Sequence, residues 1–372
     1  MPERTQPPFR ADHVGSLIRP PDLIAAREEA ESGGDRAQLE RIQQQAIRDV
    51  VALQEELGLR VATDGEYNRR AWHRDFLLRF TNVKLIPSKI SVRFHSADGT
   101  RDQTPPSWQV AGKLARPRPI FVDDFRYLAS VTRVTPKVTI PSPTVMHFRG
   151  GRDAIDSAAY PDMADFYADL AGVYAEEIAD LASAGCRYLQ LDEVNLAYLC
   201  DPALRAQVSN IGEDPDSLPR TYAKLLNDTI AGRPADMMVC MHLCRGNFAG
   251  AWVAEGGYEP IAELLFNAID VDGYLLEYDS ERAGGFEPLR FLPRGKIAVL
   301  GLVTTKSPEL ESKDALKRRI DEAARYAPLE QLALSPQCGF ESGVGGSTMT
   351  IAQQAAKLRL ITETARDVWG SA

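Results

Sequence analysis

The sequence predicts an α/β fold, built as a (βα)8 TIM barrel with an inserted hairpin or lid. Three observations predict it. Short apolar segments alternate with amphipathic helical segments along most of the chain, which is typical of βαβ units and a parallel sheet. Seven or eight such units fit into the 372 residues. Polar residues follow several predicted strands, as in barrels whose chemistry lies at one face.

A doubly wound sheet is the alternative fold. That fold usually opens with a strand, a Gly-x-Gly-x-x-Gly turn and a helix, and no such unit opens this chain. The barrel therefore remains the better prediction.

The N-terminal part supplies the first barrel strand, near residue 11 or residue 60. Residues 10–17 read as a short strand that ends in a Gly-Ser turn. The N–H groups and hydroxyl of such a turn can hold a carboxylate, although an ordinary turn is the alternative. Apolar residues spaced by three and four predict a helix over 39–57, capped by Gly58. Residues 60–66 read as a strand that ends in acidic residues.

A segment of helical spacing at 72–80 precedes a change of pattern. Residues 83–94 alternate enough for strands, whereas 98–106 and 116–119 are rich in turn formers. We interpret about 83–120 as an inserted hairpin or lid over the barrel, so residues 1–372 are expected to form one barrel domain.

From residue 137 the strand–helix alternation is regular. The predicted strands are 137–143, 188–193, 238–244, 273–278, 296–302 and 332–339, and the predicted helices are 166–181, 218–230, 261–269, 313–326 and 349–368. The glycine-rich segment 343–347 before the last helix is either an anion-binding loop or a tight turn.

Composition limits the classes of function. The formal charge is −9, and no basic cluster or long apolar run occurs, which argues against binding nucleic acid or membranes. The N-terminus lacks the core of a signal peptide, so a cytoplasmic protein is expected. Five sparse cysteines argue against a disulfide framework. A homo-oligomer is left open.

Six polar residues lie at or just past the ends of predicted strands, and a barrel brings such residues to one face. They are Glu66, Asp192, His242, Cys244, Glu277 and Cys338. Alternate strand residues share a face, so His242 and Cys244 can grip one ion. With Glu277 and Cys338 they make a four-ligand set that suits zinc. The alternative is a core histidine with buried thiols, as we read Cys186 and Cys240.

A zinc ion in a barrel mouth suits a reactive thiol, because zinc lowers a thiol's pKa and maintains a thiolate at neutral pH. A substrate thiol needs a coordination position. Glu277, the hard oxygen ligand, is the one expected to yield.

The chain resembles the catalytic barrel of the cobalamin-independent methionine synthases over nearly its whole length. The matching segments are 13–16 (HVGS), 64–66 (DGE), 189–193 (LQLDE), 241–244 (MHLC), 276–277 (LE) and 335–339 (SPQCG). The resemblance implies zinc ligation by His242, Cys244, Glu277 and Cys338. It also implies that Gly15 and Ser16 hold the carboxylate of homocysteine, while Glu66 and Asp192 hold its ammonium.

In that family a methyl group passes from a methyltetrahydrofolate polyglutamate to the thiol, completing methionine biosynthesis. Two positions depart from the family pattern. Lys306 stands where the family has a histidine that assists transfer, and Phe148 stands where it has a tryptophan that stacks on the pterin. The family also has two barrels, whereas this chain has room for one. The sequence therefore predicts weak use of folate.

The prediction is a zinc-dependent methyltransferase that converts homocysteine to methionine, with Lys306 and Glu277 as catalytic residues. Its partners are a small-molecule thiol and a methyl donor, folate or another. One alternative is a zinc alkyltransferase with another thiol or alkyl donor, similar to those that join coenzyme M to epoxides. The other is a barrel that binds zinc or a ligand without catalysis.

Overall fold

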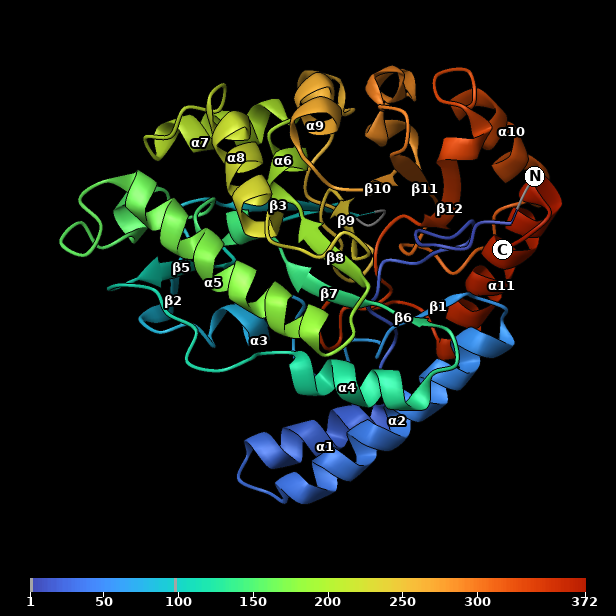
Figure 1. Cartoon of the computed structure of the whole chain (residues 1–372), viewed down its shortest axis with the longest axis horizontal. Coiled ribbons are helices and arrows are strands. Elements are labelled where there is room, and N and C mark those ends of the chain that lie inside the picture. Colours follow the sequence, from blue (N-terminus) through green and yellow to red (C-terminus); the bar gives the residue numbers. More distant parts are fainter. Residues whose placement is uncertain (1–2, 97–98) are drawn as a thin grey trace.

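A parallel sheet of six strands forms the centre of the computed structural model, which describes residues 3–96 and 99–372 (Figure 1). The strand order is β12-β11-β10-β9-β8-β7, and all neighbours are parallel. The strands are β7 Val138–Pro141, β8 Tyr188–Glu193, β9 Met238–Leu243, β10 Gly273–Glu277, β11 Ile297–Val303 and β12 Leu332–Pro336. Each matches a predicted strand to within a few residues. Their side chains are almost all buried, as expected for a parallel sheet covered on both faces.

Helices surround these strands in Figure 1. Their bounds are α1 Pro21–Glu31, α2 Arg36–Glu56, α3 Arg74–Leu77, α4 Val122–Val131, α5 Met163–Ser183, α6 Asn195–Tyr198, α7 Pro202–Asn210, α8 Leu218–Ile230, α9 Ala262–Ala268, α10 Lys313–Ala323 and α11 Ile351–Trp369. Short 3-10 helices are η1 Pro143–Met146, η2 Arg152–Ala154, η3 Glu259–Ile261, η4 Glu281–Ala283, η5 Glu287–Phe291 and η6 Leu329–Gln331. No helix in the described ranges is long and apolar enough to span a bilayer.

Two short segments flank the ends of the sheet. Next to β7, strand β6 (Thr135–Pro136) pairs in parallel with β1 (Val61–Ala62). Next to β12, Ala11 forms an isolated parallel bridge with Leu334. Between these segments the Leu17 amide donates to the Gly65 carbonyl at 3.1 Å.

The structure therefore confirms the fold class that was predicted, an α/β fold with a parallel sheet. Among the described residues the strand ladder does not run round as one closed sheet. The physical reason lies in the backbone, because Gly15, Gly65 and Glu66 have φ angles of 135°, 68° and 62°. These angles turn the chain out of the extended conformation that a ladder needs.

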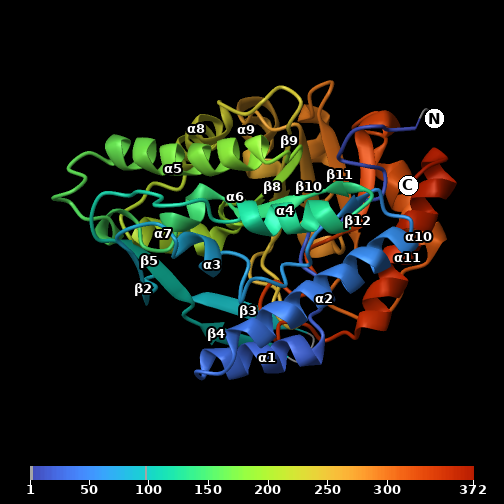
Figure 2. The same ribbon diagram turned by 60° about the horizontal axis from the view of Figure 1, so that its bottom comes forward.

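The inserted segment consists of two antiparallel pairs. β2 (Val83–Pro87) pairs with β5 (Pro106–Val110), and β3 (Val92–Ser96) pairs with β4 (Gly99–Gln103). Both pairs lie on the side of the molecule that carries α1 (Figure 2). The expectation of turns over 98–106 is wrong for 99–103, which form β4, and residue 98 lies outside the described part. Residues 99–102 are polar and exposed, so this segment lacks the apolar alternation that marks a strand.

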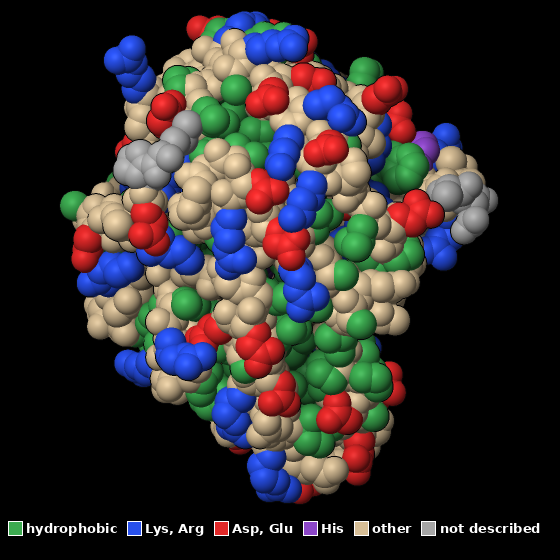
Figure 3. All heavy atoms as spheres, turned by 90° about the vertical axis from the view of Figure 1, so that its right-hand side faces the viewer, with side chains coloured by type: hydrophobic (Ala, Val, Ile, Leu, Met, Phe, Trp, Pro, Cys, Tyr) green, Lys and Arg blue, Asp and Glu red, His purple; other side chains and the backbone are tan. Residues whose placement is uncertain are grey.

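Charges of both signs are interspersed on the face that Figure 3 shows. Two ion pairs tie α10 to α11 at the surface. Lys313 Nζ lies 2.7 Å from a Glu363 carboxylate oxygen, and Lys317 Nζ lies 2.9 Å from an Asp367 oxygen. Exposed pairs of this kind each contribute about 0–1 kcal/mol.

Candidate functional site

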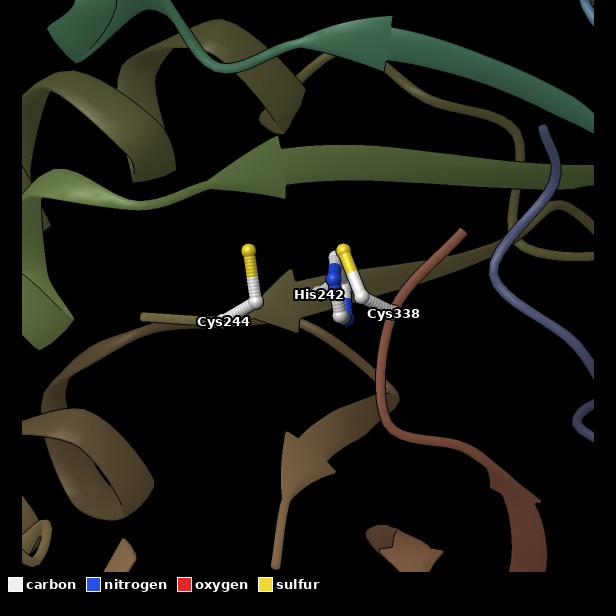
Figure 4. A group of neighbouring side chains, drawn as sticks. All are labelled: His242, Cys244 and Cys338. Atoms are coloured by element: carbon white, nitrogen blue, oxygen red, sulfur yellow. The ribbon is translucent and has the colours of Figure 1, made fainter. Parts of the chain in front are cut away.

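Three predicted ligands meet at the carboxyl ends of β9 and β12. The ligand atoms of His242, Cys244 and Cys338 all lie within 4.8 Å of one another, and all three residues are buried. In Figure 4 the sulfur atoms of Cys244 and Cys338 project to the same side of β9. β10 and β11 separate β9 from β12 in the sheet order, so the curvature of the sheet brings these residues together. The ligand atoms of a tetrahedral zinc lie roughly 3.5–3.8 Å apart, so a small contraction would suffice.

The ring of His242 is oriented for metal binding. Its Nδ1 lies 3.2 Å from the carbonyl oxygen of Leu275 on β10. A carbonyl only accepts, so Nδ1 carries the proton and the lone pair is on Nε2. Nε2 has no hydrogen-bond partner among the described residues. Fixing the tautomer through the second nitrogen is the usual arrangement of a metal-ligating histidine.

The two thiols are electrostatically unequal. A hydrogen bond from Cys338 lowers the pKa of Cys244 well below its usual value, and the same bond raises the pKa of Cys338. Burial opposes the first shift, and the neighbouring His242 ring favours it. One thiolate thus forms readily, and a cation at this position would stabilise both.

Glu277 ends β10 but does not join the three-residue cluster. Its Oε1 is engaged by Arg282 and by Lys306 Nζ at 3.3 Å, and its Oε2 accepts from the Arg245 amide at 2.7 Å. Burial raises the pKa of Glu277, but the charges of Lys306, Arg282 and Arg245 outweigh it and lower the pKa to about 2. Glu277 is therefore an ionised carboxylate held by cations.

The predicted substrate residues Glu66, Asp192 and Ser16 line one pocket with the three clustered ligands, in a cavity of about 270 Å³. Gly15, Phe148, Glu277 and Lys306 do not line it. Phe148 packs in the core, 2% exposed, with its ring centroid 6.0 Å from that of Tyr198. Lys306 Nζ lies between Glu277 and Asp279, 3.5 Å from the latter.

Glu66 and Asp192 are buried acids, and among the residues that the structure describes only Glu66 has a partner cation, because Arg69 Nη1 lies 3.7 Å from Glu66 Oε1. Thr139 Oγ1 donates to Glu66 Oε1 at 2.9 Å, while Oε2 has no partner in the described part of the chain. Gln190 donates to Asp192 at 2.6 Å. Burial and the Glu66 charge raise the pKa of Asp192 to about 7, and burial raises that of Glu66. Arg69 supplies one positive charge for these two acids, so a second cation would be stabilised beside them.

The unusual backbone of Glu66 is held by a buried arginine. Arg19 Nη2 donates to the Glu66 carbonyl oxygen at 2.9 Å, and Arg19 Nη1 donates to the Glu341 carbonyl oxygen at 2.8 Å. Arg19 also pairs with the Glu341 carboxylate at 3.5 Å. The loops after β1 and β12 are thereby fixed to each other beside the pocket.

Sequence reasoning missed several residues at the site. A Cβ on Gly339 would lie 1.9 Å from Ser16 Oγ, so this glycine allows the loop after β12 to approach the Gly-Ser turn. Missed pocket residues include Trp72, His73, Phe94, Arg149, Tyr198 and Phe248. Except for Phe94 in β3 and Tyr198 at the end of α6, these residues lie in loops, where no periodic signal marks them. Gly339 stands in the 335–339 segment already singled out.

The fold and the pocket define an α/β protein with a candidate metal cluster at the carboxyl ends of its strands. The chain belongs to the family of the cobalamin-independent synthase catalytic domain, whose model matches residues 11–366.

Relatives agree with this assignment. The uncharacterized protein YxjG of Bacillus subtilis (strain 168) is 44% identical over 372 residues, which cover 99% of this chain and 96% of the relative. The structure of a putative vitamin-B12-independent methionine synthase from Listeria monocytogenes has a TM-score of 0.77 at 36% identity, covering 98% of this chain and 99% of that chain.

A more distant relative is the 5-methyltetrahydropteroyltriglutamate–homocysteine methyltransferase of Mycolicibacterium paratuberculosis. It is 25% identical over 340 residues, which cover 90% of this chain and 41% of that enzyme. The chain therefore spans less than half the length of this named methyltransferase.

Proposed function

We propose that the protein is a zinc-dependent methyltransferase that transfers a methyl group to the thiol of homocysteine. The observation that carries the proposal is one pocket lined both by His242, Cys244 and Cys338 and by the buried acids Glu66 and Asp192. Membership of the cobalamin-independent synthase family supports methyl transfer. The localisation is proposed to be cytoplasmic.

The donor set supports zinc as the metal. Two thiolates and one imidazole are ligands that zinc prefers, and Nε2 of His242 is available. Glu277 is the proposed fourth ligand, and it would have to exchange contacts with Arg282 and Lys306 for the metal. Bound zinc would hold the substrate thiol as a reactive thiolate.

The residues of the chain would orient the amino acid. Glu66 and Asp192 bind its ammonium, and the Gly15–Ser16 turn binds its carboxylate. Lys306 and Glu277 form a cationic–anionic pair beside the cluster and set the charge there. An ammonium ligand explains why two acids are kept in a buried pocket, where unpaired carboxylates are costly. Arg69 already pairs with Glu66, so a thiol without an amine would leave one of the two acidic charges without a partner, which disfavours the alternative of another thiol.

The methyl donor is proposed to need no protonation. Lys306 is engaged by two carboxylates and does not line the pocket, so it is a poor acid for a folate nitrogen. Phe148 is packed away from the pocket and offers no stacking surface. Methylcobalamin or a sulfonium should therefore support faster transfer than methyltetrahydrofolate triglutamate.

We further propose one (βα)8 domain over the whole chain, with the inserted pairs as a lid. Eight segments would act as barrel strands: residues 10–14, 61–62, 135–141 and strands β8 to β12. Hydrogen bonds from Leu17 to Gly65 and from Asp12 to Leu334 support closure at the N-terminal segment.

The test is an assay of purified zinc-loaded protein with homocysteine and a panel of donors. The panel contains methyltetrahydrofolate as monoglutamate and triglutamate, methylcobalamin and S-methylmethionine. Methionine formation that depends on zinc supports the proposal. Absence of methionine with every donor, in protein with full zinc occupancy, would contradict it.

A further inference from the structure

One wall of the pocket carries a cation that the proposed reaction does not use. Arg149 follows η1 and lines the pocket together with the aromatic residues Trp72, Phe94 and Phe248. Its Nη1 donates to the Pro106 carbonyl oxygen at 3.2 Å. Within residues 3–96 and 99–372, no carboxylate forms an ion pair with Arg149.

Arg149 is half-buried, and its guanidinium has donors to spare for an anion. A guanidinium offers five N–H donors, and the Pro106 carbonyl and the Tyr198 hydroxyl leave most of them for a ligand. Burial lowers the pKa of Arg149, although the neighbouring Tyr198 hydroxyl opposes that shift. Arginine nevertheless remains charged at neutral pH, so the pocket wall holds a positive charge in a setting of apolar and aromatic side chains.

Arg149 is not among the residues proposed to bind the amino acid. Tyr198 also lines the pocket, and its hydroxyl lies near Arg149 and near the cysteines Cys244 and Cys338. A Cβ on Gly246, two residues after Cys244, would lie 3.0 Å from that hydroxyl. The carboxylate of homocysteine is already assigned to the Gly15–Ser16 turn.

We propose that Arg149 binds an anionic group of the methyl donor and thereby selects donors that join an anion to an apolar or planar body. The anion is a carboxylate, sulfonate or phosphate, and the body lies against Trp72, Phe94 and Phe248. This inference rests on the proposed function and names the class of its second substrate. The thiolate sulfur forms the new S–CH3 bond, while the donor's bond to that methyl breaks and its electron pair stays on the donor.

Calorimetric titration of the zinc-loaded protein tests the anion site without turnover. The probes are 4-(methylthio)benzoate and its uncharged isostere 4-(methylthio)benzamide. The unaltered protein should bind the benzoate at least about tenfold more tightly, since a charged hydrogen bond contributes roughly 1.5–3 kcal/mol. Arg149→Gln should abolish the preference, and Arg149→Lys should retain part of it. The control Arg126→Gln removes an equal charge from the exposed face of α4 and should change nothing.

Kinetics with a matched pair of donors provides the second readout. Arg149→Gln should lower kcat/KM for dimethylsulfoniopropionate at least about tenfold and leave trimethylsulfonium, which lacks an anion, within about twofold. The inference is overturned if the unaltered protein shows no preference for the benzoate, or if Arg149→Gln keeps it. Lack of transfer from every donor would contradict the proposed function, whereas the titration would still decide the anion site.

Discussion

At the scale of single residues, the site combines groups that folding alone does not favour. Glu66 holds a left-handed backbone conformation with φ 62°, which typically costs about 1–3 kcal/mol in a non-glycine residue. Its carboxylate and that of Asp192 are buried in the same pocket. Arg69 offsets part of the cost of burying the two carboxylates, and a ligand cation would offset more of it on binding.

Replacing Asp192 with Asn should weaken the binding of homocysteine far more than that of 3-mercaptopropionate. Asn keeps the size and the contact with Gln190 but removes the charge that pairs with an ammonium, a loss of about 1.5–3 kcal/mol. Titration of both thiols into zinc-loaded protein measures the two losses. Equal weakening for both thiols would exclude an ammonium-binding role.

Replacing Cys338 with Ser should remove most of the bound zinc and all thiol alkylation, because a hydroxyl is a far poorer zinc ligand than a thiolate. Metal analysis after dialysis measures the loss. Cys186→Ser is the control, since Cys186 is also buried but its Sγ contacts the Tyr188 carbonyl oxygen, away from the cluster. Full zinc occupancy in the Cys338 variant would count against the assigned ligand set.

At the scale of elements, the sequence predicted best where periodicity and burial agree. Strands β8, β9 and β12 and helices α2, α5 and α8 were found because their apolar spacing is regular. α1 was not, because its buried face includes Arg27 among small residues. The placement of Glu277 among Arg245, Arg282 and Lys306 was not predictable either, since it depends on η4 and on side chains that have no sequence periodicity.

The loop after β12 offers an element-scale test. Gly339→Ala should raise the KM for homocysteine with little loss of stability. The new Cβ would lie 1.9 Å from Ser16 Oγ and would therefore displace this hydroxyl. A serine hydroxyl can rotate, so the fold should tolerate the change. Kinetics and thermal unfolding measure the two effects. Gly232→Ala, where a Cβ meets nothing within 4 Å, is the control and should leave KM unchanged.

At the scale of the whole molecule, the N-terminal segment links β12 to the loop after β1. Lys137 Nζ is fully buried, 3.0 Å from Asp12 Oδ1 and 2.6 Å from the His13 carbonyl oxygen. His13 itself is 1% exposed. Burial and the Lys137 charge lower the pKa of His13 to about 4, against a weaker opposing effect of Asp12.

Stability should therefore fall on acidification through this histidine. Between about pH 6.5 and pH 4 the unfolded chain binds a proton at His13, whereas the folded protein does not. The contribution of His13 to the free energy of unfolding is therefore intact above about pH 6.5. Below that pH it declines by about 1.4 kcal/mol per pH unit. Urea unfolding of chelator-treated protein at several pH values, with His13→Gln as reference, measures this slope. An identical pH dependence in both proteins would refute it.

The separation of β9 from β12 in the sheet has a consequence for chain topology. A metal held by Cys244 and Cys338 would be a clasp that closes a loop containing β10, β11, β12 and the helices between them. Closing a long loop removes conformational freedom mainly from the unfolded chain. Zinc scarcity would then expose the C-terminal third of the protein to proteolysis as well as stopping methyl transfer, so the abundance of the protein in a cell would follow the supply of the metal.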